Sequence, residues 1–322
     1  MPRGKSNIVP SPIRLLPAHI EQLQTLGEVE LLDSDDFGSR FYPNDRTGQS
    51  YRRRLRLYTQ HGLLQRIELP LVSTGRQGRL PNIYRLTPKG ADLLEQETGQ
   101  RPPRYARSDP PRQSHTWLHR LGIAKIQLSF NDACAQAGLP KPDWLLEYDT
   151  LPEAKINGPM SERFVLCHQF PLANGKKLTA WPDAAALLRV PQAGQIWRLG
   201  LFVEYDRSTE THTQLNGTKR SHAGNGKLDG YSALLKTGEY QQYWPDADGV
   251  RILFVVRSEG RLRNIAETFR DHGVADSVRF AVEAEMTPER VLNSQIWRTI
   301  DGERRSIIRG STSTVRDSDA TS

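Results

Sequence analysis

Long apolar runs are missing from this 322-residue chain, and cysteine is scarce. No stretch approaches the roughly 20 apolar residues that a membrane-spanning helix needs. The opening residues, MPRGKSNIVPSPIRLL, lack the apolar core and the small-residue cleavage site of a secretory signal. The two cysteines, Cys134 and Cys167, stand far apart without metal-ligand spacing, which argues against a disulfide framework and against a zinc finger. These absences predict a cytoplasmic protein without a membrane partner.

Three common catalytic patterns are missing as well. Neither GTKRS nor GNGK has the upstream glycine and the strand-to-helix context of a phosphate-binding loop. His115 and His119 are four residues apart, but no glutamate lies between them and no third ligand is in view, which disfavours a zinc protease. No serine stands in a nucleophile-elbow sequence.

Positive charge is concentrated in one part of the chain. The formal net charge is +7, yet residues 46–89 hold ten basic side chains and a single acidic one, Glu68. The rest of the chain is therefore slightly acidic. A concentrated basic segment is typical of a nucleic-acid-binding surface, so the sequence predicts a polyanionic partner for this region.

The N-terminal region predicts three helices, then a strand hairpin and a fourth helix. Asp33 or Ser34 is the expected cap of the second helix, and Thr87 with Pro88 marks the start of the fourth. This order is that of a winged helix-turn-helix, in which the last of the three helices enters the DNA major groove. We therefore expect residues 1–97 to form a DNA-binding domain that contacts double-stranded DNA.

The third helix and the hairpin tip carry the residues that suit such contacts. Arginine forks match guanine edges and phosphates, and glutamine can pair with adenine. Tyr51, Leu55 and Tyr58 share one helix face and are expected in the core. The candidate DNA-binding residues are Gln49, Ser50, Arg52, Arg53, Arg54, Arg56, Arg76 and Arg79.

Residues 98–113 are rich in proline and arginine and predict an extended, solvated linker. From residue 114 to 302 the order is a long helix, several strands, a helix, a strand, a helix and a strand. That order predicts an α/β domain with a central mixed sheet. The tail, residues 303–322, is poor in apolar residues and is expected to be disordered.

Two acids stand on a strand that is otherwise apolar, FVEYD, where Glu204 and Asp206 share one face. Asp183, in WPDAAALL, lies on an earlier strand that can pair with it. Neighbouring strands are about 4.8 Å apart, so acids from both can converge on one cation. Mg²⁺, or Mn²⁺ in its place, binds oxygen ligands and could polarise a scissile phosphate. Asp183, Glu204 and Asp206 are therefore the candidate metal ligands.

This arrangement of elements and acids resembles the core of the PD-(D/E)XK nucleases. The second signature of that superfamily is acid, any residue, lysine, but here it is Glu204-Tyr205-Asp206, without the lysine. Some members carry the lysine on the following helix, where Lys227 stands in GKLDGY with Tyr231 one turn later. The resemblance implies the catalytic residues Asp183, Glu204, Asp206, Lys227 and Tyr231, assisted by His119 of the opening helix.

The full set of motifs along the chain resembles a single family within this broader group. A winged helix, an Arg/Pro linker, a helix with a histidine, WPDA, EYDRSTE and KLDGY together resemble the replication-relaxation family of plasmids and other mobile elements, over residues 16–300. The resemblance implies a DNA-binding protein that acts in plasmid replication, relaxation or transfer. Residues 211–226 look like an insertion relative to the compact family pattern.

Each candidate residue also has a structural interpretation. Asp183 after a proline fits a turn, His119 fits a core position, and Lys227 fits a solvated helix surface. Glu204 and Asp206 could pair with Arg198 or Arg207.

Two functions follow, and a third class stays open. The first is a divalent-metal-dependent DNA endonuclease or nickase. The alternative is a non-catalytic winged-helix transcriptional regulator or replication accessory protein with a degenerate nuclease fold. Its second domain would then serve for homodimer formation or for contacts with the shape of the DNA. An adaptor that holds partner proteins is the third class.

Overall fold

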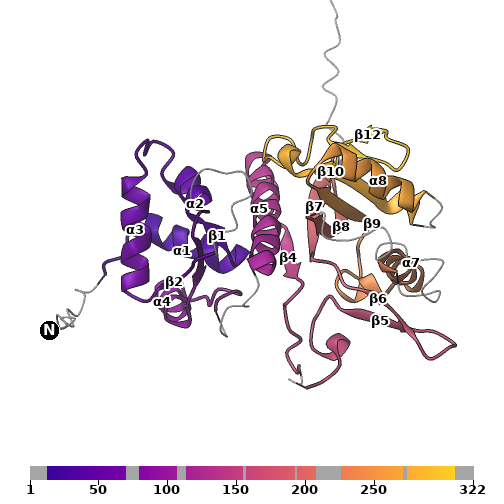
Figure 1. Ribbon diagram of the computed structural model, residues 1–322, viewed down its shortest axis with the longest axis horizontal. Helices are drawn as coiled ribbons and strands as arrows, with labels where there is room; N and C mark the ends of the chain where they lie inside the picture. Colours follow the sequence, from indigo (N-terminus) through magenta and orange to yellow (C-terminus); the bar gives the residue numbers. More distant parts are fainter. Residues whose placement is uncertain are drawn as a thin grey trace, which may run out of the picture. The chain divides into compact units, whose positions relative to one another are not determined.

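The computed structural model describes residues 13–69, 80–106, 114–154, 157–192, 194–207, 226–270 and 274–308. Its helices and its mixed sheet make the chain an α/β protein, as predicted (Figure 1). Contacts divide the chain into two compact units, Met1–Lys125 and Ile126–Ser322. This division falls inside helix α5 (Ser114–Gln136), later than the predicted boundary at residue 114, and the exact limits of the domains stay a prediction.

The first unit combines helices with a small antiparallel sheet of strand order β1-β3-β2. The hairpin of β2 and β3 was predicted, whereas β1 has only two residues and is too short to give a periodic signal. The elements in chain order are α1 (Pro17–Val29), β1 (Leu32–Asp33), α2 (Ser34–Phe41), α3 (Gln49–Gln60), β2 (Leu64–Ile67), β3 (Ile83–Leu86) and α4 (Pro88–Thr98).

Side-chain caps fix where these helices begin. The Asp33 carboxylate accepts hydrogen bonds from the backbone N–H groups of Asp35 and Asp36, at 2.9 and 2.7 Å. The Thr87 hydroxyl accepts one from Gly90 at 3.0 Å, with Pro88 as the first helical residue. Both caps were predicted, because a short acceptor side chain satisfies amide groups that the first helical turn leaves unpaired.

The apolar face of α3 is the core face of the first unit. Tyr51, Leu55 and Tyr58 are at most 8% exposed, which confirms their prediction as core residues. The Tyr58 hydroxyl donates to Gln22 at 2.7 Å, so the buried phenol keeps a hydrogen-bond partner. With this face turned inward, Arg52, Arg53 and Arg56 of α3 are exposed.

Part of the predicted linker packs against α1 within the first unit. Arg104 is buried, its backbone N–H donates to Gly27 at 2.9 Å, and its guanidinium donates to the Glu28 carbonyl at 2.6 Å. The expectation of a solvated spacer is therefore wrong for Arg104. The reason is that Arg104 donates hydrogen bonds to backbone carbonyls of α1, and such long-range contacts cannot be predicted from local composition. Residues 107–113 lie outside the described residues.

The second unit is built on a seven-stranded sheet of order β12-β11-β10-β9-β8-β7-β4. The pairs β8·β9 and β9·β10 are parallel and the others antiparallel, so the sheet is mixed, as predicted. Its strands are β4 (Asp143–Leu146), β7 (Ala184–Gln192), β8 (Gln195–Asp206), β9 (Gly249–Val256), β10 (Val278–Val282), β11 (Trp297–Arg298) and β12 (Arg304–Arg305). A separate hairpin is formed by β5 (His168–Pro171) and β6 (Lys177–Ala180).

Helices α7 (Lys227–Thr237) and α8 (Glu259–Phe269) cover one face of this sheet. Phe202 of β8 packs against Tyr231 of α7, and Phe269 of α8 packs between Phe254 and Phe280 of the parallel strands. Burial of these rings, together with the aliphatic residues around them, stabilises this core.

The other face of the sheet meets the later half of α5. Phe130 of that helix contacts Trp144 of β4 and Trp297 of β11, with ring centroids 5.9 and 6.3 Å apart. The edge strand β12 lies in the segment predicted to be disordered, so that prediction is wrong for Arg304 and Arg305, which pair with β11. Residues 309–322 lie outside the described residues.

Candidate functional site

Glu204 of β8 is a buried carboxylate held by one helix. It is 2% exposed. Lys227 Nζ donates to its Oε2 at 2.7 Å, and the Tyr231 hydroxyl donates to its Oε1. Lys227 and Tyr231 stand one turn apart on α7, so a single helix face supplies both partners. Their spacing in the sequence predicts that both residues share one helix face, and the structure brings both to Glu204.

A glycine lets α7 come this close. A Cβ at Gly230 would lie 2.1 Å from the Thr179 carbonyl oxygen of β6, far inside contact distance. Because only glycine fits against that backbone, Gly230 fixes the separation between α7 and the β5–β6 hairpin, which lie side by side in Figure 1. Lys227 and Tyr231 belong to the helix that packs in this way.

Asp206 lies two residues further on the same strand face and has a different cation. Arg261 of α8 donates from Nε to Asp206 Oδ2 at 2.6 Å, and both side chains are largely buried. Arg198, one of the partners considered from the sequence, pairs with Asp246 instead. Asp206 therefore stands in a buried ion pair with α8.

Asp183 directly precedes β7 and is attached to the backbone of β8. Its Oδ2 accepts the Tyr205 N–H at 2.7 Å, between the two acids of that strand. Its backbone carbonyl accepts the N–H of Glu147, which directly follows β4, at 2.9 Å. The carboxylates of Glu147 and Asp183 offer ligand oxygens within 4.8 Å of each other. The ends of three strands thus bring two half-buried acids together.

Glu147 was missed in the sequence analysis. The available signal was an acid that directly follows the apolar residues of WLLEYD, at a strand end. By contrast, the ligand atoms of Asp183, Glu204 and Asp206 do not all lie within that 4.8 Å spacing. The part of Glu204 and Asp206 in metal binding stays a prediction. His119 lies on α5 ahead of Lys125, in the first unit, and its part in the site also stays a prediction.

Tyr205 anchors the opposite side of the same strand. Its hydroxyl donates to Glu283 Oε1 at 2.8 Å, and burial together with the negative charge of Glu283 raises the pKa of this phenol. Tyr205 is therefore neutral at physiological pH and acts as a hydrogen-bond donor.

The exposed side of α3 is the second candidate surface. Arg54 is half-buried, with its guanidinium 5.7 Å from the centre of the Tyr58 ring. Arg76 and Arg79 fall outside the described residues. Five predicted DNA-binding residues are exposed on α3, namely Gln49, Ser50, Arg52, Arg53 and Arg56.

A family model described as "Replication-relaxation" matches residues 23–245. The chain belongs to the replication-relaxation family. The match includes α3, Asp183, Glu204 and Lys227, so both candidate surfaces lie inside the family region. Family membership points to a role in the replication or relaxation of plasmids or other mobile elements. The comparisons with curated proteins and with solved structures gave no match. In the part of the chain that the structure describes, no helix is both long and apolar enough to cross a membrane.

Proposed function

We propose that this replication-relaxation protein binds double-stranded DNA through its first unit and cuts or nicks DNA at a divalent-metal site in its second unit. One observation carries the catalytic part. The buried Glu204 of β8 is held by Lys227 and Tyr231. At the start of the neighbouring strand β7, Asp183 lies beside Glu147, which follows β4. Acids at the ends of neighbouring strands, together with a lysine and a phenol on a helix that packs against them, are the groups that metal-assisted phosphodiester hydrolysis uses.

The DNA-binding part rests on the first unit. Three helices followed by an antiparallel hairpin form the arrangement of a winged helix, in which α3 is the helix that enters the major groove. Arg53 and Arg56 are exposed on α3 and have no carboxylate partner among the described residues. Their charge is therefore available to phosphates or guanine edges.

The donor set at the strand ends suits a hard cation. Two carboxylates within 4.8 Å of each other match the oxygen ligands that Mg²⁺ or Mn²⁺ takes, usually with water and a substrate phosphate completing the shell. When bound, such an ion supplies Lewis-acid polarisation of the phosphate. Asp183 and Glu147 would hold it, with Glu204 and Asp206 as further candidate ligands and His119 as an assisting hydrogen-bond partner.

The remaining residues serve the transition state. The Lys227 ammonium, 23% exposed, lies next to Glu204 and can stabilise the negative charge that develops on the reacting phosphate. The Tyr231 hydroxyl fixes the Glu204 carboxylate, which in turn keeps the ammonium in place.

The test is incubation of supercoiled plasmid with the full chain and Mg²⁺ or Mn²⁺. We expect nicked or linear product from the wild type, a loss of at least a hundredfold in rate for Asp183→Ala and Lys227→Met, and wild-type rates for Glu267→Ala, an exposed acid of α8. Calorimetric titration with Mn²⁺ gives an independent readout, in which Asp183→Ala and Glu147→Ala should weaken binding. Equal cleavage by wild type and Asp183→Ala would remove the catalytic proposal.

One observation favours a second candidate, a non-catalytic regulator or replication accessory protein. Glu204 and Asp206 are both neutralised by cations of the chain itself, Lys227 and Arg261, so these acids are satisfied without a metal. This candidate predicts a footprint at a promoter or plasmid origin that neither EDTA nor Asp183→Ala changes. Sedimentation of the wild type and of Asp183→Ala tests the predicted homodimer.

A further inference from the structure

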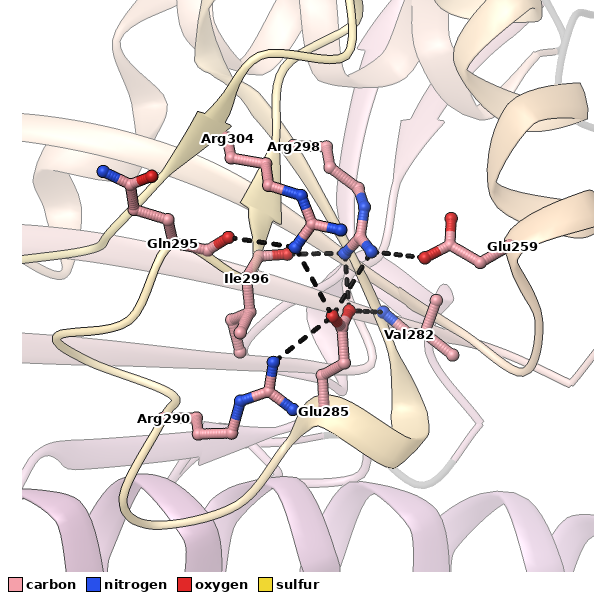
Figure 2. A network of polar contacts seen from close by, with 8 residues as sticks. All are labelled: Glu259, Val282, Glu285, Arg290, Gln295, Ile296, Arg298 and Arg304. Atoms are coloured by element: carbon pink, nitrogen blue, oxygen red, sulfur yellow. Dashed lines mark hydrogen bonds and ion pairs between the residues drawn. The ribbon is translucent and has the colours of Figure 1, made fainter.

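Arginines gather at the β12 edge of the sheet in the second unit. On the α8 face, Glu285 is surrounded by Arg290, Arg298 and Arg304, and Arg298 also donates to Glu259 (Figure 2). Arg298 is 5% exposed. Carboxylates match the buried guanidinium here, so this cluster is a structural cross-link between α8, β11 and the turn after β10.

A second cluster lies on the opposite face. Arg251 of β9 and Arg279 of β10 each stand between residues that belong to the core under α7 and α8. Alternation along a strand therefore turns both arginines to the other face. Arg305 lies directly opposite Trp297 in the antiparallel pair of β12 and β11, so both side chains point to the same face. The Trp297 ring contacts Phe130 of α5 on that face. Strands β9, β10 and β12 thus place three arginines together.

The hydrogen bonds of this second cluster leave its charge largely unmatched. The Arg251 guanidinium donates to a backbone carbonyl at 2.8 Å, and that of Arg279 donates to two carbonyls at 3.0 and 2.6 Å. Among the residues that the structure describes, neither forms an ion pair with a carboxylate. Arg305 has an exposed partner, Glu303.

The charges of Arg251 and Arg305 both act on the Arg279 guanidinium. Burial, followed by the charges of Arg251 and Arg305, lowers the pKa of Arg279, and the charge of Asp276 opposes this shift. Like charges held together on a half-buried surface create a positive potential that an external anion would relieve.

We propose that Arg251, Arg279 and Arg305 form a phosphate-binding surface that holds the DNA backbone on the second unit. Guanidinium groups bind phosphate oxygens through two parallel hydrogen bonds. The surface extends over strands β9 to β12, three spacings of about 4.8 Å each. Phosphates recur about every 3.4 Å of rise along one DNA strand, so this width suits a polyanion rather than a single phosphate. The inference rests on the proposed DNA partner, but not on the metal site.

The test measures binding of the full chain to a fluorescent duplex of arbitrary sequence over a range of salt concentrations. The variant is Arg251→Gln/Arg279→Gln. Its control, Arg263→Gln/Arg270→Gln, removes the same charge from exposed positions on or next to α8. We expect the first variant to bind about three- to tenfold more weakly than the control and its salt slope to fall by about 1 to 2, because each lost phosphate contact contributes about 0.9.

A second pair of variants keeps the test valid if Arg251→Gln/Arg279→Gln fails to fold. Arg305→Gln and Arg304→Gln change neighbouring exposed residues whose side chains point to opposite faces of β12, and only Arg305→Gln should weaken DNA binding. If each variant binds like its control, the inference is overturned. It is also overturned if the variants lose binding to phosphatidylserine vesicles and keep binding to DNA.

Variants in the first unit distinguish failure of this inference from failure of the proposed DNA-binding function. If Arg52→Ala/Arg53→Ala/Arg56→Ala loses DNA binding while the second-unit variants do not, the DNA-binding proposal stands and only this inference fails. If none of the variants changes DNA binding, both fail.

Discussion

Removing the Lys227 charge tests how much the buried Glu204 depends on α7. In Lys227→Met the aliphatic stem stays, but the ammonium 2.7 Å from a carboxylate that is 2% exposed is lost. Breaking a buried ion pair by deleting one partner costs about 3–5 kcal/mol, because an uncompensated charge remains inside. Lys227 is 23% exposed and the Tyr231 hydrogen bond persists, so we expect the lower end, about 3 kcal/mol.

A double-mutant cycle separates the pair from its surroundings. Glu204→Gln alone leaves the ammonium without its carboxylate, and Glu204→Gln/Lys227→Met removes both charges. We expect the double variant to be more stable than the sum of the single losses by about 1.5–3 kcal/mol, within the range of coupled neighbours.

Urea unfolding followed by tryptophan fluorescence is a suitable assay, because five of the six tryptophans lie in the second unit. Lys236→Met, an exposed lysine on the same helix, is the matched control and should change stability by no more than about 0.5 kcal/mol. A loss below about 0.5 kcal/mol for Lys227→Met, or additive single losses, would show that the ammonium does not stabilise Glu204.

Three further predictions concern packing and charge. Gly230→Ala should cost about 1–3 kcal/mol in urea unfolding because its Cβ meets the Thr179 carbonyl, whereas Gly260→Ala, with open space around it, should not, and equal effects would contradict the packing argument. Burial and the charge of Asp33 raise the pKa of Asp36 to about 6 against the opposing charge of Lys125, so the contribution of Asp36 to stability falls as pH rises from about 4 to 6. Asp36→Asn should therefore stabilise the first unit by about 1–3 kcal/mol at pH 7.5 and by almost nothing at pH 4 in calorimetry, and a gain independent of pH would refute this reasoning. Partial burial alone would raise the pKa of Glu285, but hydrogen bonds from Arg298 and the Val282 N–H lower it. The contribution of Glu285 to the free energy of unfolding is therefore present above pH 4.5 and is lost on acidification. Arg298→Met should cost about 3–5 kcal/mol at pH 7 and less at pH 3, and a constant cost in urea titrations would contradict the ion-pair account (Figure 2).

Local sequence determined much of the architecture. The caps at Asp33 and Thr87 were predictable because a side-chain acceptor within three residues of an unpaired amide is a local property. The inward face of α3 followed from the helical period, and the shared face of Glu204 and Asp206 followed from the period of a strand. The concentration of arginine on α3 is likewise a property of the sequence alone.

Tertiary structure decided which of these residues meet. Glu147 reaches Asp183 because β4 pairs with β7 in a register that aligns their ends, and no local pattern encodes that register. Lys227 reaches Glu204 from α7, which packs closely on β6 at Gly230, while Arg261 of a different helix reaches Asp206. The period of a strand places two acids on one face, but the cation that each acid receives depends on how distant helices pack across the sheet.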